Sequence, residues 1–164
     1  MRVRPLRLVG VLLTIFVTQA LAAPTTSQVA LVAKLYRDFS FEAILAEPRL
    51  ENSDFVEQPR SVLLQYLEPK LADLILRDRA CVAATHEICR LDFAPLWGNQ
   101  DPAGAEVRVA PGATANTVVV SIRYGSTTTQ LLYYLSRTAK GWRIRNISYE
   151  SGRFTLIDIL ETKQ

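Results

Sequence analysis

Hydrophobic residues in the first half of the chain recur every three to four positions, which is the spacing of an amphipathic α-helix. This spacing predicts three helices before residue 90. The first begins at a cap formed by Thr26 or Ser27 and ends before Pro48, because a proline cannot continue a helix. The second and third begin at Pro59 and Pro69, since proline suits the first helical turn. The residues expected to face the core are Val29, Val32, Ala33, Tyr36 and Phe39 or Ile44 in the first helix, Val62, Leu63, Tyr66 and Leu67 in the second, and Leu71, Leu74 and Ile75 in the third.

From about residue 105 the hydrophobic period changes to two, which is typical of β-strands. One of these runs is apolar on both faces, with Leu131, Tyr133 and Leu135 on one side and Leu132 and Tyr134 on the other. Such a strand belongs in the middle of a sheet. The expected strands are residues 105–110, 116–124, 129–137 and 141–149, with reversals at Gly112, Gly125-Ser126 and Lys140-Gly141.

The order of elements predicts an α+β fold, in which N-terminal helices pack on a curved antiparallel sheet of three to four strands. The tail, residues 153–163, is expected to dock on the fold as a short closing element. Its hydrophobic residues are Phe154, Leu156, Ile157 and Leu160.

The N-terminus has the three-part layout of a secretory signal. Arg2, Arg4 and Arg7 precede an apolar run over residues 8–17, and small residues follow at 20–22. The run is shorter than the ~20 residues that a transmembrane helix needs. We expect a signal peptide over residues 1–22 that is cleaved after Ala22, and a single α+β domain over residues 23–164. The mature protein would be periplasmic or secreted and would carry no transmembrane anchor.

Removal of the signal changes the charge of the protein. The whole chain has 19 Lys and Arg against 16 Asp and Glu, a net charge of +3. Without the three arginines of residues 1–22, the mature chain has equal numbers of basic and acidic residues. We therefore expect no nucleic-acid partner, because a neutral chain has no general attraction for phosphate backbones.

The two cysteines, Cys81 and Cys89, are predicted to form a disulfide, since an oxidising compartment favours pairing. The alternatives are free thiols and a metal site. The metal site is disfavoured because Cys81, His86 and Cys89 lack both the spacing and a fourth ligand. No metal and no cofactor are predicted. His86, which lies between the cysteines, is expected on an exposed turn rather than as a general base.

Two stretches resemble a known family. "LDFAPLWGNQD" at residues 91–101 and "GWRIRNISYESGRFTLIDIL" at residues 141–160 are similar to signature segments of a bacterial envelope family of unknown function. The resemblance implies a cone-shaped fold like that of nuclear transport factor 2 and the cystatins, and a location in the cell envelope. It implies no activity, substrate or catalytic residue.

Several residues are candidates for a pocket or a partner surface. Asp92 and Asp101 could act as an acid/base pair with Tyr36 or Tyr66, or could accept hydrogen bonds from backbone groups in turns. Trp97 is expected to anchor its loop to the core together with its neighbours Phe93 and Leu96.

Arg143 and Arg145 alternate along the last strand, and Arg123 is expected on the same outer face. The three could bind an acidic partner, or could belong to a solvated face of the sheet. Asn146 begins an Asn-x-Ser pattern, but we expect no glycosylation there.

These observations favour an uncharacterised secreted or periplasmic protein that binds an unknown protein or small ligand and is not an enzyme. An inhibitor or immunity-type protein is one form of this hypothesis. The alternative is an isomerase or hydratase that acts on a small molecule with Asp92 or Asp101 as acid/base. A closed cavity with a buried carboxylate would favour the enzyme, and a filled interior would favour the binding protein.

Overall fold

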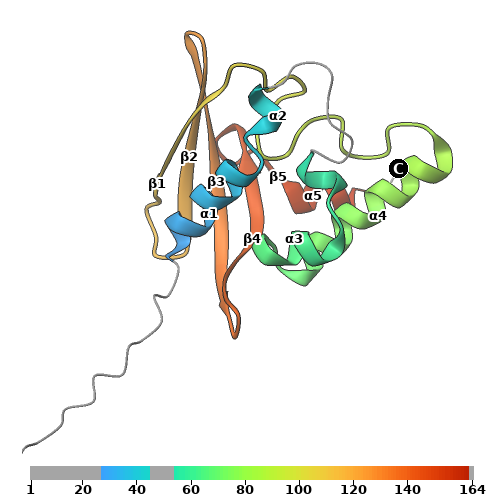
Figure 1. Ribbon diagram of the computed structural model, residues 1–164, viewed down its shortest axis with the longest axis horizontal. Helices are drawn as coiled ribbons and strands as arrows, with labels where there is room; N and C mark the ends of the chain where they lie inside the picture. The colour runs from blue at the N-terminus through green and yellow to red at the C-terminus, as the bar shows by residue number, and fades with distance from the viewer. Residues whose placement is uncertain (1–26, 45–53, 163–164) are drawn as a thin grey trace, which may run out of the picture.

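The computed structural model describes residues 27–44 and 54–162 (Figure 1). The predicted signal peptide, its cleavage site after Ala22 and the alternative cap at Thr26 lie outside the described residues. Of the helices in the part that is described, none has both the length and the apolar character needed to cross a membrane.

The first predicted helix is present as two shorter ones, α1 (Gln28–Asp38) and α2 (Phe41–Ile44). Ser27 caps α1 by accepting a hydrogen bond from the next turn, so this choice of cap is confirmed. The break falls at Phe39 and Ser40, where the Ser40 hydroxyl donates to the Arg37 carbonyl at 3.1 Å and competes with the helical pattern. Phe39 is buried, whereas Ile44 is 66% exposed, so Phe39 takes the inward position.

The second and third predicted helices are confirmed as α3 (Arg60–Tyr66) and α4 (Pro69–Thr85), with a short 3₁₀ turn, η1 (Phe55–Glu57), before them. Leu67 and Glu68 separate the two helices in extended conformation, and the Glu68 N–H donates to the Ile144 carbonyl at 2.9 Å. This junction therefore pairs with the edge of the sheet. Most of the residues predicted to face inward are buried: Leu63, Tyr66, Leu67, Leu71, Leu74 and Ile75. Val62, which was also predicted to face inward, is only partly buried.

The four expected strands are present as β1 (Glu106–Pro111), β2 (Thr117–Tyr124), β3 (Thr127–Thr138) and β4 (Gly141–Tyr149). A fifth strand, β5 (Phe154–Thr155), pairs with Ser148 and Tyr149. The prediction of three to four strands was therefore one strand short. Two residues are too few to show an alternating pattern, so the tail could not be recognised as a strand. The sheet is antiparallel throughout, in the order β1-β2-β3-β4-β5.

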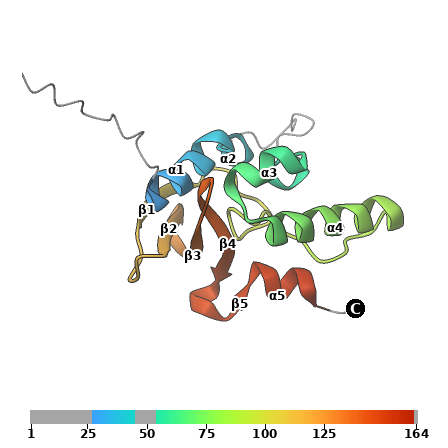
Figure 2. The ribbon, with the colours of Figure 1, turned by 90° about the horizontal axis from the view of Figure 1, so that it is seen from below.

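The helices lie on two sides of this sheet (Figures 1 and 2). Helix α1 runs across one face and contacts β1, β2 and β4. The last helix, α5 (Leu156–Glu161), lies on the other side, beside α4 and β4. The core fills the space between α1, α3, α4 and the inner face of the sheet.

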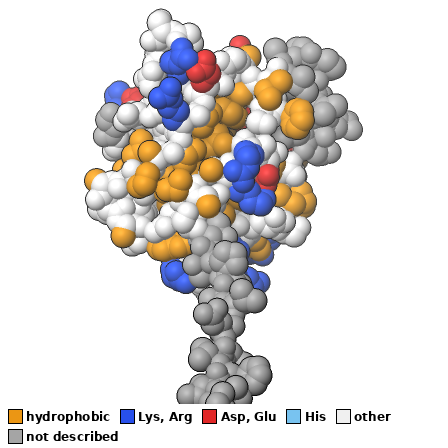
Figure 3. Space-filling view, turned by 60° about the vertical axis from the view of Figure 1, so that its left-hand side comes forward, with side chains coloured by type: hydrophobic (Ala, Val, Ile, Leu, Met, Phe, Trp, Pro, Cys, Tyr) orange, Lys and Arg blue, Asp and Glu red, His pale blue; other side chains and the backbone are white. Residues whose placement is uncertain are grey.

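The register of β3 and β4 shifts between Tyr134 and Leu135, where Arg145 is the extra residue. Such a bulge bends a strand and increases its twist. At the other end of the sheet, β1 is an edge strand, and hydrophobic side chains gather on the face of the molecule that contains this edge (Figure 3).

Candidate functional site

The inner face of the sheet is covered by the connection between α4 and β1. We call residues 93–101 of this connection the plug. The plug closes on itself, because the Ala94 N–H donates to the Asn99 carbonyl at 3.0 Å and the Gly98 N–H donates to the Ala94 carbonyl at 3.0 Å. At its centre Leu96 and Trp97 are 0% and 2% exposed. The expectation that these side chains anchor the loop to the core is confirmed.

Tyrosine hydroxyls hold the plug in place by donating to three consecutive backbone carbonyls. The pairs, with the donor first, are Tyr149 with Pro95 at 3.0 Å, Tyr36 with Leu96, and Tyr124 with Trp97 at 3.2 Å. A fourth hydroxyl, that of Tyr133, lies 2.9 Å from the Tyr36 hydroxyl. Buried carbonyls need hydrogen-bond partners, and these hydroxyls supply them. The space beneath the plug is therefore occupied by aromatic side chains whose hydroxyl groups are hydrogen-bonded.

Burial keeps these tyrosines neutral. It raises the pKa of Tyr36, Tyr133 and Tyr149 well above the ordinary range, and raises the pKa of Tyr124 to about 12. The physical cause is the loss of hydration, which disfavours the phenolate. All four remain hydrogen-bond donors at neutral pH.

Helix α2 is tied to the plug by Glu42, a residue that the sequence analysis did not select. One carboxylate oxygen of Glu42 accepts the Trp97 indole N–H at 2.5 Å, and the other accepts the Phe55 N–H. The Trp97 ring packs edge-on against Tyr36, with centroids 5.3 Å apart. A glutamate in an exposed helical turn gives no sequence signal of a partner 55 residues away.

The segment that leads into the plug is fixed to α4 in two ways. Cys81 and Cys89 form the predicted disulfide, with Cα atoms 6.2 Å apart. Asp78, which is 5% exposed, accepts the N–H of Arg90 at 2.9 Å and the N–H of Leu91 at 3.4 Å. The carboxylate of Asp78 is thus engaged by backbone donors, and the sequence analysis missed it because a single Asp within a helix has no distinctive pattern.

His86 lies where the exposed-turn prediction places it. It follows α4 as the C-cap, in the left-handed conformation with φ of 57°, and its backbone N–H donates to the Val82 carbonyl at 2.8 Å. The residue is exposed, and its side chain makes no hydrogen bond within residues 27–44 and 54–162.

The four acid/base candidates do not come together as a catalytic group. Tyr36 is bound to the plug, and the Tyr66 hydroxyl donates to Asp38 and accepts from the Lys34 ammonium at 2.8 Å. The Asp101 carboxylate accepts the Ala103 N–H at 3.2 Å in a turn. Asp92 is exposed and has no ion pair or hydrogen bond within the described part of the chain.

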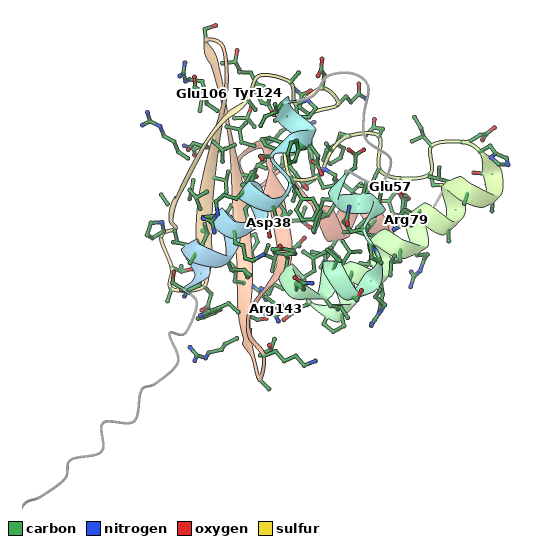
Figure 4. The ribbon with its side chains drawn as sticks, viewed as in Figure 1. Asp38, Glu57, Arg79, Glu106, Tyr124 and Arg143 are labelled. Carbon is green, nitrogen blue, oxygen red and sulfur yellow. A yellow bond between two sulfur atoms is a disulfide. The ribbon has the colours of Figure 1, made fainter. Side chains whose placement is uncertain are left out.

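The three arginine candidates each contact a different group. The Arg143 guanidinium donates to the Leu64 carbonyl at 2.9 Å, close to the end of α3, and Figure 4 shows it at the opposite end of the sheet from Tyr124. Arg145, at the bulge, lies over the Tyr134 ring at 5.7 Å. Arg123 forms an ion pair with Glu106 on the neighbouring strand. Each guanidinium therefore has its own local partner.

Three hollows surround the plug, and Phe93 lines all of them. The first is a pocket of about 520 Å³ whose lining includes Asp92, Tyr149 and Phe154, and we call it the aromatic pocket. The second holds about 210 Å³ and also contains Asp92. The third is a groove of about 560 Å³ along α4, next to the Glu57–Arg79 ion pair labelled in Figure 4.

No protein-family model and no curated protein matches this chain. Among solved structures, it is similar to the phospholipid-binding protein from Ralstonia solanacearum in complex with a phospholipid. The TM-score is 0.36 and the sequence identity is 13%, over 79% of this chain and 76% of that chain. A likeness at this level assigns neither a family nor a ligand. What the structure itself defines is an α+β protein with a five-stranded antiparallel sheet.

Proposed function

We propose that this chain is an exported, non-enzymatic protein that binds a small ligand in the hollows around the plug. The observation that carries the proposal is the filled interior. Tyr36, Tyr133 and Tyr149 are at most 5% exposed, and their hydroxyls are engaged with one another or with the plug. A substrate could not reach them unless the plug came away from the sheet.

The proposal includes the envelope family that residues 91–101 and 141–160 resemble, and its cone-shaped fold. Two features support this fold: α1 lies across the inner face of the sheet, and β4 carries a bulge that bends it. The Cys81–Cys89 disulfide supports export, because such bonds persist in oxidising compartments. An inhibitor or immunity-type role is a narrower form of the proposal, in which the ligand is part of another protein.

Ligand-observed and protein-observed NMR test the proposal. Isotope-labelled mature protein is titrated with a chemically mixed set of small organic cations, anions and neutral compounds. We expect at least one class to shift the backbone amides of Phe93, Gly98 and Leu131, which border the hollows. Shifts confined to Tyr36 and Tyr133 would place binding beneath the plug and contradict the proposal, as would the absence of any shift.

A further inference from the structure

The floor of the aromatic pocket is built from three aromatic rings in continuous contact. Phe93 packs edge-on against Tyr149 with centroids 5.2 Å apart, and Tyr149 stacks on Phe154 at 5.9 Å with an interplanar angle of 28°. The Tyr149 ring cannot turn freely, because it is 3% exposed and its hydroxyl is bound to the Pro95 carbonyl. The buried Tyr149 ring therefore holds Phe93 and Phe154 in place, and these two half-buried rings offer aromatic surface to the pocket.

The lining of this pocket carries negative charge only. Asp92 and Glu150 line it, together with the amides Asn99 and Gln100, and no Lys, Arg or His is among its lining residues in the described chain. Glu150 forms an ion pair with Arg153 at 3.3 Å, but the Arg153 side chain is 78% exposed. An exposed pair of this kind contributes little and can be exchanged for another cation.

The backbone at Glu150 gives a second reason to regard its carboxylate as functional. Glu150 has φ of 45°, in the left-handed region that favours glycine or asparagine. A glutamate at this position is less stable than either of those residues would be. Strained residues of this kind concentrate at ligand sites. Glu150, in this conformation, is among the residues that line the aromatic pocket.

We infer that the aromatic pocket binds a small organic cation, an alkylated ammonium group attached to a short polar or apolar chain. This inference rests on the proposed function and names the ligand class. An alkylated ammonium is attracted to the faces of aromatic rings and, in the same position, to nearby carboxylates. The amides of Asn99 and Gln100 can bind a hydroxyl or carbonyl on the attached chain.

Choline and its neutral isostere dimethylbutanol, in which a tert-butyl group replaces the trimethylammonium, provide a matched pair of probes. Both are titrated into the mature protein by calorimetry and NMR. We expect choline to bind at least about fivefold more tightly than dimethylbutanol. We also expect the amide shifts to centre on Gly98, Leu131 and Tyr149.

Variants of the residues that line the pocket test whether choline binding depends on charge or on shape. Asp92→Asn and Glu150→Asn should each weaken choline binding about fivefold and leave dimethylbutanol binding unchanged. Glu150→Asn should not lower stability, since asparagine tolerates the left-handed backbone. Arg153→Ala, which removes the competing cation, should strengthen choline binding about twofold. Glu106→Gln removes a carboxylate that pairs with Arg123 away from this pocket, and it is the matched control with no expected effect.

Equal affinity for choline and dimethylbutanol would overturn the inference, as would choline binding that neither Asp92→Asn nor Glu150→Asn weakens. The proposed function would survive both results, because it requires only that some small ligand binds around the plug. Vesicles of phosphatidylcholine present the same head group on a lipid. Co-sedimentation that Glu150→Asn weakens would assign the cation to a lipid head group, and binding of free choline alone would assign it to a soluble ligand.

Discussion

At the scale of single residues, the buried tyrosines serve as neutral hydrogen-bond donors to the plug. Tyr36, Tyr124 and Tyr149 each donate a hydrogen bond to one carbonyl of the plug. This arrangement depends on the protonated phenol, since a phenolate cannot donate to a carbonyl. The stability of the fold should therefore depend on pH in the alkaline range.

We predict that the free energy of unfolding does not change between neutral pH and about pH 10 and falls above it. The pKa of Tyr124 is raised from 10.0 to about 12 in the folded protein, so its contribution is complete below 10 and is lost as the pH rises through 12. Urea unfolding at a series of pH values measures this dependence. Tyr124→Phe should make the decline between pH 10 and 12 shallower. A decline of unchanged slope in this variant would contradict the prediction.

Gly98 lies at a point of the plug where an added side chain has little room. Its φ is +62°, and a Cβ placed on it would lie 3.1 Å from Leu131 Cδ2 and 3.4 Å from Tyr149 Cδ1. We predict that Gly98→Ala lowers the free energy of unfolding by about 1–3 kcal/mol more than Gly125→Ala does. Gly125 is the matched control, because its φ is +57° and nothing lies within 4 Å of the added Cβ. Equal losses in urea unfolding would show that only the backbone conformation matters.

At the scale of elements, the plug is held by contacts that come from both ends of the chain. Glu42 on α2, Asp78 on α4 and Tyr149 at the end of β4 all bind the plug or the segment that leads into it. The disulfide adds a covalent tie between α4 and the same segment. Loss of one tie should lower stability without releasing the plug.

We predict that the double variant Cys81→Ser, Cys89→Ser loses about 2 kcal/mol of stability and keeps its fold. The plug should stay docked, because the Asp78 carboxylate still accepts the N–H groups of Arg90 and Leu91. Urea unfolding measures the loss, and the near-ultraviolet circular dichroism of the buried Trp97 reports docking. The wild type after chemical reduction is the control and should behave in the same way. A collapse of the Trp97 signal in either sample would show that the disulfide alone positions the plug.

At the scale of the whole molecule, charge is balanced overall and unbalanced locally. The mature chain that we expect has as many basic as acidic residues, yet Asp92 and Glu150 lie on one pocket without a basic residue among its described lining. Attraction of a cation would therefore be a property of this pocket and not of the protein surface as a whole. The balance depends on removal of residues 1–22.

We predict that the mature protein begins at Ala23 and is recovered from the periplasm or the medium. The basis is the series of basic, apolar and small residues over positions 2–22. N-terminal sequencing of the protein from its native host decides the point, and an intact Met1 would contradict it. Leu12→Arg, which interrupts the apolar run, should leave the uncleaved precursor inside the cell.

Local patterns in the sequence were sufficient for most of the elements, although they did not predict the break between α1 and α2. The period of 3.6 located α1, α3 and α4, the period of two located β1 to β4 within two residues at each end, and Ser27 marked the first cap. The pairing of Cys81 with Cys89 followed from compartment and spacing. These features depend on residues close together in the chain, which is why the sequence alone determined them. The strand β5 was not predicted, because a strand of two residues is too short to show an alternating pattern.

Only the tertiary structure determined the contacts between residues that are far apart in the sequence. The sequence left open an acid/base group of Asp92 or Asp101 with Tyr36 or Tyr66. The fold binds Tyr36 to a carbonyl 60 residues away and leaves Asp92 on the lining of a pocket. It also gives Arg143 and Arg145 different partners, the Leu64 carbonyl and the Tyr134 ring. The aromatic pocket exists only because Phe93, Tyr149 and Phe154 meet once the chain has folded. Hydrogen bonds and ring contacts of this kind depend on how the helices and strands pack. The local pattern of hydrophobic residues does not show which distant donor will bind a buried carbonyl.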